Sequence, residues 1–516
     1  MANSLFRKKT LDLLLAEMAG EHRLRRVLGP VALSCLGIGA IIGAGIFVVT
    51  GKAAAQTAGP AVMLSFVVAG TACVFAALCY AEFASMAPVA GSAYTYAYAT
   101  MGELLAWIIG WDLVLEYAVG AATVANGWSS YFQHVLMAFG ISLPVEISGP
   151  LVAANSTLGN LQYTGSYINL PAVLIVALVT IVLVVGIRES AKFNGAMVVV
   201  KVLVVLFVIA VGAFYINPEN WTPFAPFGYS GVTFFGHTVM GQPAPGGHPV
   251  GMLAGGAIIF FAYIGFDSVS THAEEAKNPS RDVPIGILSS LIICTVLYVA
   301  VAAVLTGMIP YQKINVDAPV ADAFAQIGLP WAQFLISVGG VAGITSVLLV
   351  MMLSQPRVLL AMSRDGLVPP SFFGAIHDRF RTPWKSTILT GLFVGLLAAF
   401  LPINVLAELV NIGTLFAFVV VCAAVLIMRY TNPNAKRPFR VRFVPLIPLL
   451  GMGSCLLLMF SLPVENWYRL GAWLALGLII YFLYGRRHSV LGRTLGKEIT
   501  RHGISPGGAP KRDPDD

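Results

Sequence analysis

Twelve apolar runs, each long enough to cross a lipid bilayer, determine what this chain can fold into. They lie at about residues 31–50, 60–86, 103–127, 169–187, 193–215, 251–275, 285–309, 331–362, 385–401, 403–428, 443–462 and 468–484. About 20 apolar residues span the hydrocarbon core as a helix, since in lipid the backbone must satisfy its own hydrogen bonds. With 57% hydrophobic and 11% charged residues, the chain is too apolar for a soluble protein. The sequence predicts an all-α polytopic membrane protein with twelve transmembrane helices.

The placement of basic residues predicts the orientation of these helices. If the N-terminus lies inside, only Lys52, Lys313 and Arg469 of the 31 lysines and arginines fall outside, and Lys201 falls within a span. Positive charge concentrates on the cytoplasmic side, so we expect both termini in the cytoplasm and the protein in the inner or plasma membrane. No nucleic-acid motif accompanies these charges, so the lipid bilayer is the expected environment and no nucleic acid is an expected partner.

The first span has four glycines within nine positions, Gly37, Gly39, Gly43 and Gly45. Each disfavours a helix interior by about 1 kcal/mol relative to alanine. The glycines therefore indicate either close helix packing or a broken helix. The sixth span has a second candidate break around Gly265. Two sets of five spans enter the membrane from opposite sides, so the pattern predicts a 5+5 inverted repeat with broken first and sixth helices.

The chain divides accordingly. The predicted parts are a cytoplasmic N-terminal segment at 1–29, a first repeat at 30–215, an extracellular loop at 216–250, a second repeat at 251–428, two further spans at 429–488, and a disordered cytoplasmic tail at 489–516. Residues 139–168 form a second long external stretch. The glycine- and proline-rich residues 241–248 predict a flexible loop.

Several motifs resemble a known superfamily. They are Gly-Ile-Gly-Ala-Ile-Ile-Gly-Ala-Gly-Ile-Phe at 37–47, the residues 79–84 and 88–96, Phe260 to Asp267, Glu-Glu-Ala-Lys-Asn-Pro at 274–279 with 284–287, and Ser-Arg-Asp-Gly at 363–366. Together they resemble the amino acid–polyamine–organocation (APC) superfamily, and more narrowly a bacterial form of its cationic amino acid transporter family. The resemblance extends from about residue 10 to 488. It implies a LeuT-like architecture and transport by alternating access. No catalytic triad, metal cluster or phosphate loop occurs in the sequence, so we expect no enzyme activity.

The resemblance also implies a substrate site at the two breaks. The amides of Gly43, Ala44 and Gly45 would receive an amino acid's carboxylate, and the carbonyls of Phe260, Phe261 and Ile264 its ammonium. A separate pocket would hold the side chain, lined by Ile38, Ile41, Ile42, Glu116, Val119, Phe261, Phe266 and Met351. Most of these are large and apolar, which favours small to medium neutral side chains such as that of alanine. Ordinary helix packing is the alternative role for each.

Lys201 is a cation within the fifth span, where it costs about 3 kcal/mol on insertion scales. The resemblance implies that this lysine takes the place of a sodium ion between the first and eighth spans, near Thr345 and Ser346. Protons are then the expected coupling ion, with no sodium, metal or cofactor. The alternative is that Lys201 extends to a membrane interface.

Acidic residues provide further candidates for proton coupling. Glu116 and Asp267 lie at the depth of the site, although Asp267 could instead cap a helix. Asp112 shares a helix face with Glu116 at the i, i+4 spacing, or is a surface charge. Glu82 and the tyrosines Tyr94, Tyr96 and Tyr98 are expected at the cytoplasmic closure.

The leading hypothesis is a proton-coupled transporter of neutral L-amino acids. A transporter or exchanger of arginine and lysine is the alternative within this class, and an amino acid sensor that does not transport is the alternative from another class. A small single-span accessory membrane protein and the oligomeric state are left open.

Overall fold

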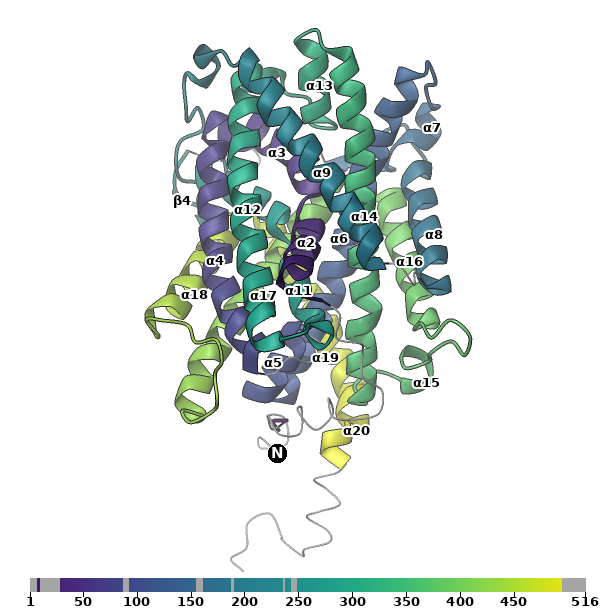
Figure 1. Cartoon of the computed structure of the whole chain (residues 1–516), viewed down its shortest axis with the longest axis vertical. Coiled ribbons are helices and arrows are strands. Elements are labelled where there is room, and N and C mark those ends of the chain that lie inside the picture. Colours follow the sequence, from purple (N-terminus) through teal and green to yellow (C-terminus); the bar gives the residue numbers. More distant parts are fainter. Residues whose placement is uncertain are drawn as a thin grey trace, which may run out of the picture.

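The computed structural model describes residues 7–9, 28–86, 92–154, 161–186, 190–234, 237–242 and 248–493. These residues are mostly helical, and the helices run side by side along the long axis of the molecule (Figure 1). Residues 10–27, 243–247 and 494–516 lie outside the described part. The predictions of an N-terminal cytoplasmic segment and a disordered tail fall largely on these residues.

The helices are α2 (Pro30–Ile41), α3 (Thr50–Ala53), α4 (Val62–Met86), α5 (Ser92–Thr100), α6 (Glu103–Ala138), α7 (Val145–Ser148), α8 (Leu170–Val185), α9 (Ser190–Gly212), α10 (Met252–Ile259), α11 (Ser268–Thr271), α12 (Pro279–Met308), α13 (Pro319–Gln326), α14 (Pro330–Arg364), α15 (Pro370–Phe373), α16 (Trp384–Phe400), α17 (Ile403–Thr431), α18 (Leu446–Met459), α19 (Val464–Ile480) and α20 (Arg486–His488). Short 3-10 or π-helical turns accompany them: η2 (Gly45–Val49), η3 (Ala54–Ala58), η4 (Gly59–Ala61), η5 (Ala213–Tyr215), η6 (Pro218–Trp221), η8 (Phe260–Tyr263), η9 (Ala273–Glu275), η10 (Tyr311–Lys313) and η11 (Tyr481–Gly485).

Each predicted apolar run coincides with a helix or a broken helix. Within the described residues, eight helical stretches are long and apolar enough to cross a membrane, and one of them, Pro30–Met86, covers the first two predicted runs. Three shorter apolar helices, α8, α16 and α18, cover three more runs. The chain is therefore a multi-pass helical membrane protein.

The two long external stretches contain more structure than the sequence indicates. Strand β1 (Val152–Ala154) pairs antiparallel with β2 (Leu161–Tyr163), and β3 (Val232–Phe234) pairs antiparallel with β4 (His237–Met240). The backbone of Thr233 donates to the carbonyl of Phe460, so the second hairpin is fastened to the bundle beyond α18. The predicted flexible loop at 241–248 begins after β4 and falls largely on residues 243–247, which lie outside the described part.

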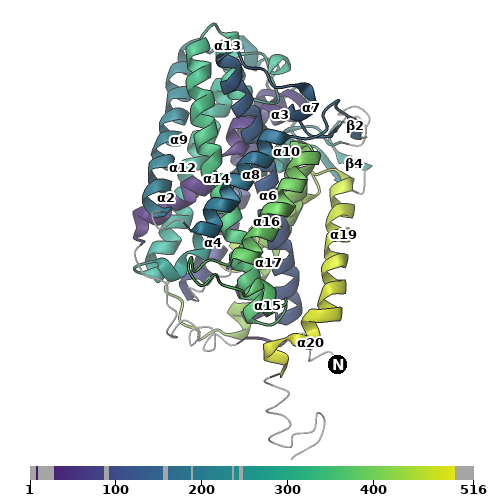
Figure 2. The same cartoon turned by 90° about the vertical axis from the view of Figure 1, so that its right-hand side faces the viewer.

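Burial separates central from peripheral helices. The most apolar window of α10–α11 is 89% buried and that of α6 is 78% buried, whereas that of α19 is 22% buried. Figure 2 shows α19 along one side of the bundle. The central helices therefore have protein around them at bilayer depth, which is where a broken helix is tolerated.

The bundle has two distinct ends. Helices α5, α15 and α20 lie at one of them, called here the α20 end, and α3, α7 and α13 lie at the opposite α13 end (Figures 1 and 2). At the α20 end, the amide of Val490 donates to the carbonyl of Asp365, and the ammonium of Lys9 lies 3.0 Å from the carboxylate of the same residue. Both ends of the described chain therefore meet at the α20 end.

Candidate functional site

The first broken helix has its interruption at Ile42. Helix α2 ends at Ile41, and Ile42 has φ −72° and ψ 102°, which is extended backbone. Helical structure resumes at Ala44 and continues through η2. In a continuous α-helix the carbonyl of residue i accepts from the amide of residue i+4. The break therefore deprives carbonyls just before it of their helical partners and turns the following amides out of the helical pattern.

Side chains from other helices satisfy the freed carbonyls. The hydroxyl of Tyr298 on α12 donates to the carbonyl of Ile41 at 2.8 Å. The Lys201 ammonium on α9 donates to the carbonyls of Gly39, at 2.5 Å, and Ile42, at 3.0 Å. A buried carbonyl without a partner would cost about 1–3 kcal/mol, so these contacts stabilise the break.

The third hydrogen bond of Lys201 goes to Ser346 Oγ of α14, at 3.0 Å. The side chain is fully buried, so Lys201 does not extend to a membrane interface. Thr345, expected nearby, accepts from Trp128 Nε1 at 2.8 Å instead. All three donors of the ammonium are used, and they tie α9 and α14 to the broken first helix.

The second broken helix lies against the first. Helix α10 passes into η8, Ile264 leaves the helix with ψ 134°, and α11 follows. Gly265 has φ +118°, and a Cβ on it would lie 2.8 Å from the carbonyl oxygen of Ala40. A Cβ on Gly45 would overlap Ala262. The two interruptions are therefore in direct contact, and both approaches require glycine.

The residues expected to contact substrate are all buried, but some of them already pack against or hydrogen-bond to other parts of the protein. The ring of Phe266 packs on Tyr80 and Phe418, with centroids 6.0 and 5.1 Å away, and Phe260 packs on Phe418 at 5.7 Å. The carbonyl of Phe261 already accepts from the amide of Ile264 at 3.3 Å. The Phe260 and Phe266 side chains thus have a packing role in this conformation.

Met351 on α14 lies opposite Gly120 on α6. A Cβ at position 120 would be 3.2 Å from Met351 Sδ. Gly120 follows Val119 directly and is one helical turn from Glu116. The structure therefore brings Met351 to the same stretch of α6 as two of the other predicted pocket residues, next to the first broken helix.

The three acidic residues Asp112, Glu116 and Asp267 are all buried. The Asp267 carboxylate accepts from the hydroxyl of Tyr117 at 2.7 Å, and makes no capping hydrogen bond to α11. Asp112 is fully buried between α6 and α17, so the interpretation as a surface charge is wrong. Among the described residues, both oxygens of Asp112 and one oxygen of Glu116 and of Asp267 have no hydrogen-bond partner.

At the α20 end, Glu82 of α4 closes the bundle through arginines. Its carboxylate accepts two hydrogen bonds from Arg429 of α17, at 2.6 and 2.9 Å, and lies 3.3 Å from Arg437. It also accepts from the amide of Val441 at 2.8 Å. These contacts join α4 to α17 and to the segment that follows it.

The tyrosines of α5 contribute to the same closure. Tyr94 donates to Asp365 at 2.6 Å, Tyr98 donates to Glu103 at 3.2 Å, and Tyr96 stacks on Phe83. Burial, and then the charge of Asp365, raise the pKa of Tyr94 above its ordinary value, so its hydroxyl remains a donor. The sequence indicated these tyrosines but not Asp365 as the partner of Tyr94.

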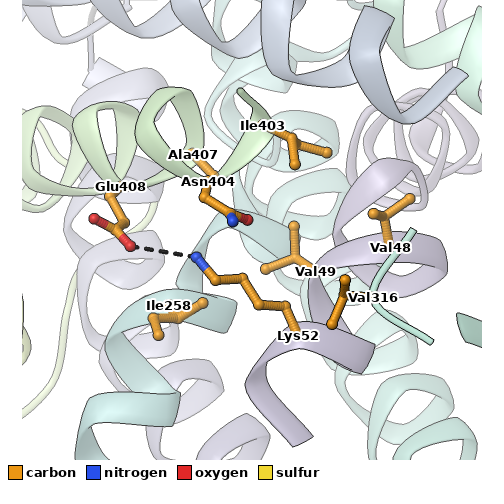
Figure 3. Close-up of a pocket in the computed structure, with 9 residues that line it drawn as sticks. All are labelled: Val48, Val49, Lys52, Ile258, Val316, Ile403, Asn404, Ala407 and Glu408. Atoms are coloured by element: carbon orange, nitrogen blue, oxygen red, sulfur yellow. Dashed lines mark hydrogen bonds and ion pairs between the residues drawn. The ribbon is translucent and has the colours of Figure 1, made fainter. Parts of the chain in front are cut away.

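A small pocket at the α13 end was not predicted. Lys52 on α3 and Glu408 on α17 face each other across it, with Nζ 3.5 Å from Oε1 (Figure 3). Asn404 and six apolar residues complete the lining: Val48, Val49, Ile258, Val316, Ile403 and Ala407. The second half of the broken first helix is thus joined to α17 here. The signal in the sequence was Lys52 itself, a cation just after the first apolar run.

Comparison with known proteins identifies the family of this chain. A family model described as amino acid permease matches residues 28–481. The chain belongs to the amino acid permease family of the APC superfamily. This confirms the resemblance found in the sequence motifs.

Two relatives of this permease match along their whole length. A branched-chain amino acid permease of Bacillus subtilis, BcaP, is 47% identical over 494 residues, which is 96% of this chain. A methylthioribose transporter of the same organism is 45% identical over 491 residues, or 95% of this chain. A vacuolar cationic amino acid transporter of Arabidopsis thaliana is 39% identical, with 84% of this chain and 68% of that protein aligned. All three are named as carriers, so the permease is not an enzyme, and their named substrates differ.

Proposed function

We propose that this permease couples proton entry to the uptake of neutral L-amino acids, such as alanine, across the cytoplasmic membrane. The observation that carries the proposal is the contact between two broken helices, where Gly45 meets Ala262 and Gly265 meets Ala40. A buried lysine ties the first of these helices to α14. Broken helices that meet at bilayer depth are where transporters of this kind bind substrate.

The proposed architecture is a LeuT-like 5+5 inverted repeat with twelve transmembrane helices. Helices α2 to α9 would form the first repeat, α10 to α17 the second, and α18 and α19 would lie outside both. The distribution of basic residues assigns the α20 end to the cytoplasm. The Glu82–Arg429 contacts would then close the cytoplasmic side, and the Lys52–Glu408 contact the external side.

The backbone would recognise the common part of the substrate. The amides of residues 43–45 follow the first break, at the positive end of a half-helix, and suit a carboxylate. The carbonyls of Phe260, Phe261 and Ile264 suit the ammonium, since the chain there leaves the helical pattern. This arrangement leaves the substrate side chain to a separate pocket.

Lys201 would provide the coupling. When it is protonated, its three N–H groups hold Gly39, Ile42 and Ser346 together. A neutral amine has only two N–H groups, so loss of the proton removes at least one of these contacts and loosens the first helix from α14. No sodium ion is needed, because the ammonium supplies the positive charge. Glu116 and Asp267 are the further candidates for carrying the proton.

The pocket favours a neutral substrate. Met351 and Val119 are apolar and buried beside Gly120. A branched-chain amino acid is the second candidate, because the relative that is 47% identical is named for that substrate. We expect Met351→Ser to weaken alanine uptake and to admit arginine. Competition of labelled alanine uptake by leucine and by arginine distinguishes the three candidate substrates: small neutral, branched-chain and cationic amino acids. Unchanged arginine binding in Met351→Ser would contradict the proposed pocket.

Uptake in proteoliposomes tests the proposal as a whole. We expect labelled alanine to accumulate only under an inward proton gradient and to leave again when a protonophore is added. Amino acid binding without any flux would favour the sensor, and uptake confined to arginine and lysine would favour the cationic alternative.

A further inference from the structure

The buried carboxylate of Asp112 has no assigned role in this transport scheme. Asp112 lies on α6 and is fully buried, and neither carboxylate oxygen has a hydrogen-bond partner among the described residues. Its Oδ1 lies 2.8 Å from the place where a Cβ on Gly413 of α17 would be. A side chain there would collide with the carboxylate, so α17 packs directly on Asp112.

Asp112 belongs to a row of three buried carboxylates. Glu116, one helical turn away, is 1% exposed, and so is Asp267. Glu116 interacts electrostatically with both Asp267 and Asp112. Each of the three has at least one buried oxygen without a partner, and no ion pair joins any of them to a lysine or arginine within the described residues.

Three adjacent negative charges at bilayer depth are not stable without compensation. No described cation supplies it, so protons must neutralise part of the row, and a member that is still ionised can accept a proton from its neighbour. A protonated carboxyl is both donor and acceptor, so each member of the row can take up a proton and pass it on. The tyrosines beside Glu116 and Asp267 are Tyr117 of α6, Tyr80 of α4 and Tyr96 of α5, and their phenols bring no positive charge.

The row has a direction. Helix α6 begins at Glu103, whose carboxylate accepts from Ser489 and Tyr481 at the α20 end. Asp112 is therefore nearer that end than Glu116 is, while Asp267 lies next to the second helix break. The three carboxylates lead from the substrate site toward the α20 end.

We propose that Asp112 is a proton-carrying residue that receives the coupled proton from Glu116 and passes it toward the α20 end. Neither Asp112 oxygen lies within hydrogen-bond distance of Glu116, so a water molecule relays the proton between them. In the transfer the O–H bond at Glu116 breaks, the water gains this proton and gives up another, and an O–H bond at Asp112 forms. Glu116 becomes a carboxylate and Asp112 a neutral acid. In the present packing Gly413 of α17 covers the Asp112 carboxylate. Water can therefore take the proton from Asp112 only after α17 moves away. This inference rests on the proposed proton coupling.

The substitution Asp112→Asn tests the proposal, because asparagine keeps the size of the side chain and cannot carry the proton. Asp322→Asn on α13 is the control, since the Asp322 carboxylate accepts from nearby Gln326 and belongs to no ion pair among the described residues. Purified proteins in liposomes are compared in two assays: proton entry driven by alanine, followed with an internal pH dye, and exchange of labelled for unlabelled alanine, which needs no net proton movement. We expect Asp112→Asn to lose proton entry and keep exchange, and Asp322→Asn to match the wild type.

Infrared difference spectroscopy provides a readout that does not depend on transport. The protonated carboxylic C=O band of the wild type should lose the part that belongs to Asp112 in Asp112→Asn, while the parts that belong to Glu116 and Asp267 remain. If that band is unchanged in the variant, Asp112 carries no proton and the inference fails, even where the wild type itself shows no proton-coupled uptake. Proton entry that survives in a folded Asp112→Asn also overturns it, as does replacement of the proton by added sodium. If asparagine prevents folding, Asp112→Glu should retain both the band and the flux.

Discussion

Gly265 provides the sharpest test of the contact between the two broken helices. Its φ of +118° lies in a region that residues with a side chain rarely adopt. In addition, a Cβ would stand 2.8 Å from the Ala40 carbonyl oxygen and 3.0 Å from the Ala40 Cβ. We therefore expect Gly265→Ala to destabilise the protein and to separate the two breaks.

The magnitude follows from these two terms. Backbone strain at a position restricted to glycine costs about 1–3 kcal/mol, and overpacking in a dense core about 1–3 kcal/mol. The expected loss in the free energy of unfolding is about 2–6 kcal/mol. Gly395→Ala in the middle of α16 is the matched control, because the nearest atom to its new Cβ is Val176 Cγ1 at 3.8 Å. That substitution should be neutral or stabilise the helix by about 0.5–1 kcal/mol.

Thermal unfolding of the purified variants in detergent, with and without alanine, measures both effects. We expect a lower midpoint for Gly265→Ala and a loss of the stabilisation by alanine, with the wild-type response in Gly395→Ala. If the two variants have the same midpoint and the same response to alanine, the break geometry described for Gly265 is incorrect.

Two further substitutions test contacts that hold the bundle. Tyr298→Phe removes the hydroxyl bound to a freed carbonyl of the first break, so we expect a loss of about 1–3 kcal/mol, and an unchanged unfolding midpoint would contradict the role of this hydroxyl. Glu82→Gln leaves Arg429 and Arg437 without their carboxylate, which should cost about 3–5 kcal/mol and loosen the α20 end. Its control is Glu146→Gln on the exposed helix α7, and equal unfolding midpoints for the two variants would show that the Glu82 contacts stabilise nothing.

Local signals in the sequence were enough to locate the two breaks and the buried lysine. Glycines within an apolar run and a cation within a span are each costly in lipid, so they identify positions where other parts of the protein must compensate. The structure has the interruptions at Ile42 and Ile264 and the lysine contacts to Gly39, Ile42 and Ser346.

The partners of these groups could not be predicted in the same way. Tyr298 satisfies a carbonyl 257 positions away, and Arg429 meets Glu82 across 347 positions. Such contacts depend on how helices pack, and a single sequence carries no signal for them. The same limit applies to Asp112, where only the packing of α17 distinguishes a buried acid from a surface charge.

The most direct measurement is alanine uptake into proteoliposomes under an inward proton gradient, with wild type beside Lys201→Met. Methionine fills similar space without a charge, and loses the bonds to Gly39, Ile42 and Ser346. We expect concentrative uptake by the wild type and loss of proton-driven uptake in the variant. Equal proton-driven uptake by both proteins would contradict the claim that Lys201 couples the proton to the broken helix.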